Sequence, residues 1–189
     1  MSLKVDFTLD AKGLACPMPI VKTKKAMNDL VDGQVLVVEA TDKGSKADIA
    51  AWSDTVGHQY IGTTEEGDVL KHYIRKSSDD SIVEKNHGQI VQMDELLSKI
   101  EAGGVIVDVR EEAEYAFGHI DGAKSIPLGD LELHINELEQ YKEKAIYVIC
   151  RTGTRSDLAA QKLASNGFNN VWNVMPGMTQ WTGDVKKSI

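Results

Sequence analysis

The stretch Ala145-Ile146-Tyr147-Val148-Ile149-Cys150, followed directly by Arg151-Thr152-Gly153-Thr154-Arg155-Ser156, decides the fold of the second half of the chain. Its first six residues form a near-continuous apolar run, which is typical of a strand covered on both faces. A second run of this kind spans Val105 to Val109. Helices predicted near residues 112–117, 131–141 and 156–166 alternate with these strands. This alternation predicts an α/β domain with a central parallel sheet.

Cys150 stands at the end of the first of these strands, immediately before a polar loop. In open α/β sheets, ligands bind at the carboxyl ends of strands, where loop and helix N–H groups point outward. Those N–H groups and the guanidinium groups of Arg151 and Arg155 favour an anionic sulfur, and the thiolate is the reactive nucleophile. Gly153 allows the loop to curl tightly around the sulfur. The sequence therefore predicts a nucleophilic Cys150 rather than a small buried cysteine with only a packing role.

Residues 89–185 resemble the rhodanese family. The resemblance is carried by Asp108-Val109-Arg110-Glu111, Glu114-Tyr115, Gly118 to Leu128, the Cys150 to Ser156 loop, and Gly177-Met178 followed by Trp181. It implies that Cys150 accepts a sulfane sulfur as a persulfide from a small-molecule donor. It also implies that the loop binds the donor's anionic end through Arg151, Thr152, Gly153, Thr154 and Arg155.

The length of the loop separates two chemistries that share this architecture. Related phosphatases place one more residue between the nucleophilic cysteine and the arginine than this chain does between Cys150 and Arg155, and Ser156 occupies the position of the phosphatase arginine. The shorter loop suits a single sulfur atom. A phosphatase or arsenate reductase-like activity is the minor alternative.

The first half has the predicted order β-α-β-α-β-β, which indicates a small two-layer sandwich. The strands are expected at residues 5–9, 34–40, 59–64 and 69–75, with a second helix at 47–56 closed by Gly57. The first helix has apolar residues at Ile20, Met27 and Val31, and Gly33 marks its stop.

Cys16 is predicted to lie immediately before this first helix, because Pro17 and Pro19 suit the first turn of a helix. A thiol at the positive end of a helix is expected to have a lowered pKa. Three nearby lysines could add to this field, but a solvated helix face explains them more simply: Lys22, Lys24 and Lys25.

Residues 4–76 resemble the TusA family of small sulfur-carrier proteins. The resemblance is carried by Asp10 to Pro19 and by Thr41-Asp42-Lys43-Gly44-Ser45, with Asp48-Ile49 and Gly57-His58. It implies that Cys16 carries sulfur as a persulfide.

The two halves are joined by polar sequence, Lys76 to Ser81 and then Lys85-Asn86-His87-Gly88. This composition predicts a sulfur-carrier domain at 4–76, a linker at 77–88 and a rhodanese-like sulfurtransferase domain at 89–189.

Composition excludes several classes of function for the 189 residues. The 21 basic and 29 acidic side chains give a net charge of −8, so direct nucleic-acid binding is not expected. No apolar run approaches the roughly 20 residues of a membrane span, and the first residues lack a signal peptide's apolar centre, which predicts a cytoplasmic protein. The five histidines and two cysteines show no metal-ligand spacing, so no metal or other cofactor is expected.

These observations predict a sulfurtransferase fused to its own carrier. Cys150 would take sulfur from thiosulfate or a low-molecular-weight persulfide and relay it to Cys16, for delivery to an acceptor protein or thiol. The alternative is a redox sensor or partner-docking protein without turnover, acting through a disulfide between the two cysteines.

Overall fold

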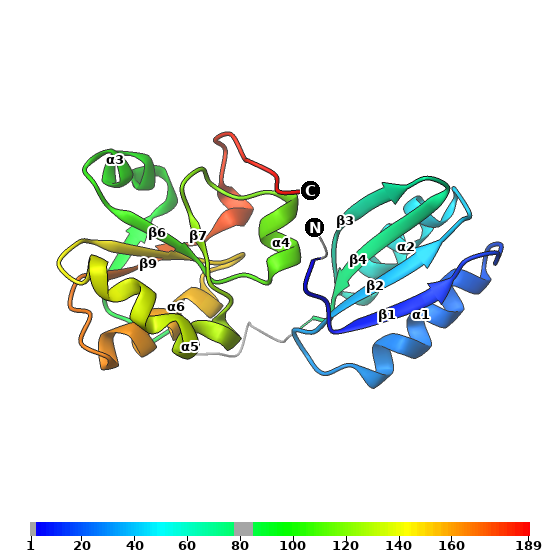
Figure 1. The fold of residues 1–189 in the computed structure, drawn as a ribbon, viewed down its shortest axis with the longest axis horizontal. Helices are drawn as coiled ribbons and strands as arrows, with labels where there is room; N and C mark the ends of the chain where they lie inside the picture. Colours follow the sequence, from blue (N-terminus) through cyan, green and yellow to red (C-terminus); the bar gives the residue numbers. More distant parts are fainter. Residues whose placement is uncertain (1–2, 78–84) are drawn as a thin grey trace. The chain divides into compact units, whose positions relative to one another are not determined.

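The computed structural model describes residues 3–77 and 85–189. The chain divides between Asp79 and Asp80 into two compact units, each with its own sheet (Figure 1). The predicted linker at 77–88 lies mostly outside the described residues. None of the helices within residues 3–77 and 85–189 combines the length and the apolar character that crossing a bilayer requires.

The first unit has the predicted β-α-β-α-β-β order. Its elements are β1 (Phe7–Ala11), α1 (Met18–Asp29), β2 (Val35–Ala40), α2 (Ser45–Val56), β3 (Gln59–Glu66) and β4 (Val69–Arg75). The sheet order is β1-β2-β4-β3; β1 and β2 run parallel, and the other neighbours run antiparallel. Both helices cover one face of the sheet, so the unit is the expected two-layer sandwich (Figure 1).

Some helix and strand ends in this unit differ from the prediction, and others agree with it. Helix α1 ends at Asp29, so Val31 lies beyond it and is exposed, whereas Ile20 and Met27 pack in the core as expected. Gly57 closes α2 in the left-handed conformation, with φ of 80°. Strand β3 runs to Glu66 rather than ending at residue 64, while β4 begins at Val69 as predicted, so only Gly67 and Asp68 form the turn.

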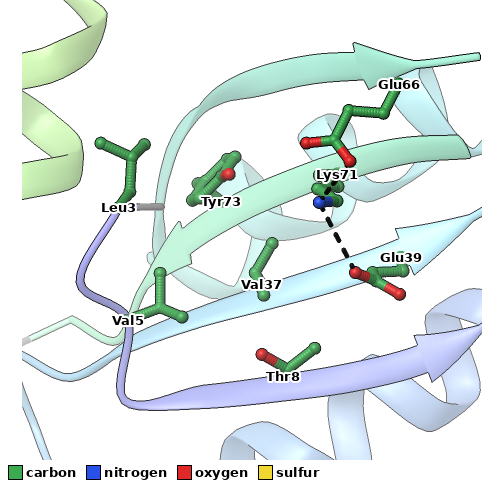
Figure 2. Close-up of a pocket in the computed structure, with 8 residues that line it drawn as sticks. All are labelled: Leu3, Val5, Thr8, Val37, Glu39, Glu66, Lys71 and Tyr73. Carbon is green, nitrogen blue, oxygen red and sulfur yellow. Dashed lines mark hydrogen bonds and ion pairs between the residues drawn. The ribbon is translucent and has the colours of Figure 1, made fainter. Parts of the chain in front are cut away.

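The face of the sheet opposite the helices carries a groove of about 380 Å³ (Figure 2). Lys71 Nζ lies 2.7 Å from a Glu66 carboxylate oxygen and 3.9 Å from one of Glu39. Apolar side chains line the end of the groove where β1 begins, so one end of the groove is charged and the other is apolar. The lining residues are Leu3, Val5, Thr8, Val37, Glu39, Glu66, Lys71 and Tyr73.

The second unit is built on a five-stranded sheet in the order β5-β9-β8-β6-β7, in which every pairing is parallel. This confirms the predicted central parallel sheet, and two apolar clusters pack against it. Its strands are β5 (Ile90–Gln92), β6 (Val105–Asp108), β7 (Lys124–Ser125), β8 (Ile146–Ile149) and β9 (Val171–Met175). Its α-helices are α3 (Leu96–Glu101), α4 (Glu112–Phe117), α5 (Leu131–Leu138) and α6 (Thr154–Ser165), with 3-10 turns at Met93–Glu95, Leu128–Asp130, Glu139–Tyr141 and Met178–Gln180.

Three strands of this sheet were not predicted. Strands β5 and β7 have only three and two residues, and β9 carries the polar Asn173 at its centre, which interrupts the apolar run that marks a buried strand. Helix α6 also starts at Thr154 rather than Ser156, because Gly153 turns the chain directly into the helix with φ of 92°.

Candidate active sites at Cys150 and Cys16

Cys150 follows the last residue of β8 and is buried at the base of the loop that leads into α6. The Gly153 N–H donates a hydrogen bond to Cys150 Sγ at 3.1 Å, and Ser156 Oγ lies 3.3 Å from the same sulfur. Gly153 adopts the left-handed φ that the tight curl needs. The loop therefore curls back onto the sulfur, with one backbone donor aimed at it.

The segment after β9 holds this loop in place. The N–H groups of Met178 and Thr179 donate to the carbonyl oxygens of Cys150 and Arg151 at 2.9 and 3.1 Å. A Cβ on Gly177 would lie 2.5 Å from the Cys150 carbonyl oxygen, and Gly177 has φ of 98°. Only glycine fits this close approach, so Gly177 allows the segment after β9 to lie close against the Cys150 loop.

The two loop arginines have different environments. Arg155 is buried and forms a bidentate ion pair with Glu114 of α4, at 2.6 and 3.0 Å. Burial disfavours its charge, but the Glu114 carboxylate more than offsets this and raises the pKa of Arg155 above its ordinary value. Arg151 is exposed. Arg151 and Arg155, which the sequence treats as equivalent, therefore differ in their environment, because the charge of Arg155 is already matched by Glu114.

The remaining residues predicted to bind the donor differ in exposure. Thr152 is half-buried, while Gly153 and Thr154 are buried in the first turn leading into α6. Within the second unit, Arg151 and Thr152 are thus the loop side chains that reach toward solvent.

Lys85 is a further cation beside the loop that sequence reasoning missed, since it fell within the predicted linker. Its Nζ lies 3.7 Å from the position that a Cβ on Gly153 would take. The residues after it are anchored: the N–H groups of Asn86 and His87 donate to the buried Asp157 carboxylate at 3.0 and 3.1 Å. No local sequence signal could have found this contact, because Asp157 is 71 residues beyond Asn86.

Cys16 is exposed and lies just before Pro17 and α1, as the sequence predicts. The expected lowering of its pKa is wrong. A hydrogen bond to the Asp48 side chain raises the pKa of Cys16, followed in effect by burial and by the negative charges of Asp48 and Asp42. Helix α2 places Asp48 in its first turn, and this carboxylate opposes the helix-end effect at α1. The lysines at 22, 24 and 25 are exposed, which agrees with a solvated face.

The loop that carries Asp42 is held by a buried histidine. Ser45 Oγ donates to the Asp42 carbonyl oxygen at 2.6 Å and lies 2.9 Å from His72 Nε2. Since the Ser45 proton is used on Asp42, His72 Nε2 carries the proton of that contact. Burial lowers the pKa of His72 to about 4, so the ring is neutral near pH 7. Thr41 Oγ1 accepts the Gly13 N–H at 2.9 Å, which ties this loop to the segment that precedes Cys16.

Two α/β units, each presenting one cysteine ahead of a helix, define a two-domain protein of the thiol-based sulfur-transfer class. The family model "Sulfurtransferase TusA" matches residues 7–76, and the model "Rhodanese-like domain" matches residues 92–184. The chain belongs to the family of proteins that join a TusA domain to a rhodanese-like domain.

Several known proteins share parts or all of this arrangement. The "Putative sulfur carrier protein YrkF" of Bacillus subtilis is 47% identical over 183 residues, covering 96% of this chain and 98% of that protein. "Putative sulfur carrier protein YrkI" of the same organism is 62% identical over 74 residues, which are 39% of this chain and 99% of that protein. A rhodanese-like domain protein from Staphylococcus aureus aligns at 33% identity and a TM-score of 0.48, over 52% of this chain and 97% of that one. The family matches and the full-length relative support a role in sulfur transfer.

Proposed function

We propose that the protein is a sulfurtransferase that loads a sulfane sulfur onto Cys150 and relays it to Cys16 for delivery to an acceptor protein or thiol. Thiosulfate or a low-molecular-weight persulfide serves as the donor. The observation that carries the proposal is the Cys150 loop, in which the Gly153 N–H points at Sγ from 3.1 Å at the start of α6. The exposed Cys16, placed before α1, supports the carrier role.

The reaction needs only thiol exchange chemistry. The Cys150 thiolate attacks the outer sulfur of thiosulfate, a new S–S bond forms, and the S–S bond of the donor breaks as sulfite leaves with the electron pair. The Cys16 thiolate then attacks the outer sulfur of the Cys150 persulfide. This displaces Cys150 as a thiolate and leaves the persulfide on Cys16, so no external oxidant or reductant enters the cycle.

The charges around the loop favour an anionic donor. Arg151 is exposed and Lys85 Nζ lies beside Gly153, whereas the charge of Arg155 is matched by Glu114. We expect Arg151→Gln and Lys85→Gln each to raise KM for thiosulfate by about two- to fivefold, the effect of losing one exposed charge contact. Lys162→Gln is the matched control, since Lys162 is exposed on α6 and pairs with Glu132. An unchanged KM in both loop variants would remove the two cations from the donor site.

A cyanide-trapping assay tests which cysteine reacts with the donor. Cys150→Ser should abolish thiocyanate production from thiosulfate, while Cys16→Ser should keep it, because only Cys150 lies in a loop with a backbone donor on the sulfur. Full activity of Cys150→Ser, or none in Cys16→Ser, would reverse the assignment.

Persulfide mapping by mass spectrometry tests the relay. After donor is added and removed, wild type should carry persulfide on Cys16, and Cys16→Ser should accumulate it on Cys150. In Cys150→Ser, Cys16 should stay unlabelled. Relay within one chain would be independent of protein concentration, because the partner cysteine is tethered at a fixed effective concentration. Labelling of Cys16 in Cys150→Ser at the wild-type rate would show that the two cysteines load separately.

A further inference from the structure

Asn173, at the centre of β9, is connected to the sulfur of Cys150 through Ser156. The Asn173 side-chain oxygen lies 2.6 Å from Ser156 Oγ, and Ser156 Oγ lies 3.3 Å from Cys150 Sγ. On its other side, Asn173 Nδ2 lies 3.1 Å from the Gly153 carbonyl oxygen and 3.5 Å from an Asp157 carboxylate oxygen. Asn173 and Ser156 are fully buried, so these contacts are shielded from competition by bulk water.

The acceptors around Asn173 determine where each proton lies. Gly153 O and the Asp157 carboxylate can only accept, so the amide nitrogen of Asn173 must face them and its oxygen must face Ser156. An amide oxygen cannot donate, and the single hydroxyl proton of Ser156 is therefore given to Asn173. Ser156 is left with only lone pairs toward Cys150. The contact at 3.3 Å is then a hydrogen bond from the Cys150 thiol to Ser156 Oγ.

The Ser156 contact suits the thiol, whereas the Gly153 N–H, which donates to the sulfur, suits the thiolate. When Cys150 loses its proton, the Ser156 lone pairs face a negative sulfur, and the contact becomes favourable only if the hydroxyl proton turns from Asn173 to the sulfur. Asn173 and the thiolate therefore compete for one proton.

We propose that Asn173 is a positioning residue for the chemistry at Cys150: it holds the Ser156 hydroxyl proton while Cys150 is a thiol and gives it up when the sulfur becomes an anion. The proposal rests on the proposed role of Cys150 as the nucleophile. Through its bond to the Gly153 carbonyl, Asn173 also fixes the residue whose N–H points at Sγ. The same side chain thus controls two of the groups that contact the sulfur.

Other charged groups face the loop and must stay constant in a test. They come from four places: the pair of Arg155 with Glu114, Asp157 on α6, Arg151 in the loop, and Lys85 ahead of β5. Glu111 also lies 3.8 Å from Arg155. None of these residues is substituted in the variants below, and the 3.5 Å contact of Asn173 with Asp157 is lost equally when Asn173→Leu is made with or without Ser156, so the comparison of the two backgrounds cancels it.

The test is the pH dependence of Cys150 alkylation by iodoacetamide in a Cys16→Ser background. Asn173→Leu removes the competing acceptor, so we expect the midpoint of the rate profile to move to lower pH by roughly half to one unit, the equivalent of one net hydrogen bond. Ser156→Ala removes the shared proton. Adding Asn173→Leu to Ser156→Ala should therefore produce no further shift to lower pH.

Two outcomes would overturn the proposal. A midpoint that is unchanged in Asn173→Leu would show that Asn173 has only a structural role, and an equal shift with and without Ser156 would show that the effect passes through Gly153 alone. If Asn173→Leu fails to fold, the infrared S–H stretch decides: Ser156→Ala should move the Cys150 band to higher frequency, and an unmoved band refutes the thiol-to-Ser156 bond. Neither readout uses a sulfur donor, so a failure here is distinct from a loss of thiocyanate production.

Discussion

Breaking the ion pair between Arg155 and Glu114 should destabilise the second unit far more than breaking an exposed pair on the same helix. The two contacts are 2.6 and 3.0 Å long, and the exposed fractions of the side chains are 7% and 1%. Arg155→Met leaves the Glu114 carboxylate buried without the Arg155 charge, which costs about 3–5 kcal/mol of unfolding free energy. In contrast, Lys162 and Glu132 pair at 2.9 Å with 44% and 70% exposure, so Lys162→Met should cost about 0–1 kcal/mol.

Urea unfolding followed by tryptophan fluorescence measures this difference. In a Trp52→Phe background, the remaining tryptophans, Trp172 and Trp181, both report on the second unit. Glu114→Gln combined with Arg155→Met should recover most of the lost stability, since no buried charge is then left unpaired. The amide oxygen of Gln can still accept the Glu111 N–H that the carboxylate accepts at 3.1 Å.

The reasoning would be refuted if Arg155→Met cost no more than the Lys162 control, or if the double variant were no more stable than Arg155→Met alone. The double variant also tests function. Because the charge of Arg155 is matched by Glu114, its KM for thiosulfate should stay within about twofold of wild type, the range of a lost weak charge contact. A KM raised beyond that of Arg151→Gln would return Arg155 to the donor site.

Three further perturbations test other parts of the structure. Asp48→Asn should shift alkylation of Cys16 to lower pH in a Cys150→Ser background, because the Asp48 hydrogen bond is the largest cause of the raised pKa; no shift would contradict this. His72 has its pKa lowered from 6.5 to about 4, so the folded state binds a proton less readily than the unfolded chain. The unfolding free energy of the first unit should therefore be fully retained above pH 6.5 and fall by about 3 kcal/mol as the pH falls to 4. Urea unfolding followed by Trp52 fluorescence measures this fall. In His72→Gln the unfolding free energy should depend less on pH. Gly177→Ala should reduce thiosulfate turnover about tenfold or more. Gly122→Ala is the control and should keep the turnover, because Gly122 also has a positive φ, of 77°, but nothing lies within 4 Å of the added Cβ. Equal effects of the two substitutions would mean that backbone strain alone is responsible.

Local patterns in the sequence were sufficient for most of the architecture and for both cysteines. Near-continuous apolar runs identified β6 and β8 at the centre of the second sheet, and Gly57 identified the end of α2. Pro17 and Pro19 placed Cys16 before a helix. These signals act through backbone propensity and side-chain periodicity, which depend on neighbours in the chain.

Strand β9 was missed because its central residue, Asn173, is polar. Its burial is tolerated only because Ser156 and Gly153 supply hydrogen-bond partners, and they lie 17 and 20 residues earlier in the chain. No apolar run marks such a strand, so its identification requires knowledge of which segments meet.

The sequence by itself determined the two α/β units, their order and the two cysteines placed ahead of helices. Tertiary structure alone decided the electrostatic environment of each site: Glu114 matches the charge of Arg155 from 41 residues away, Asp48 reverses the expected pKa shift of Cys16, and Asp157 holds the segment that carries Lys85. The physical reason is that a helix or strand forms from preferences of adjacent residues, whereas charge and hydrogen-bond energies depend on distance in space and on burial.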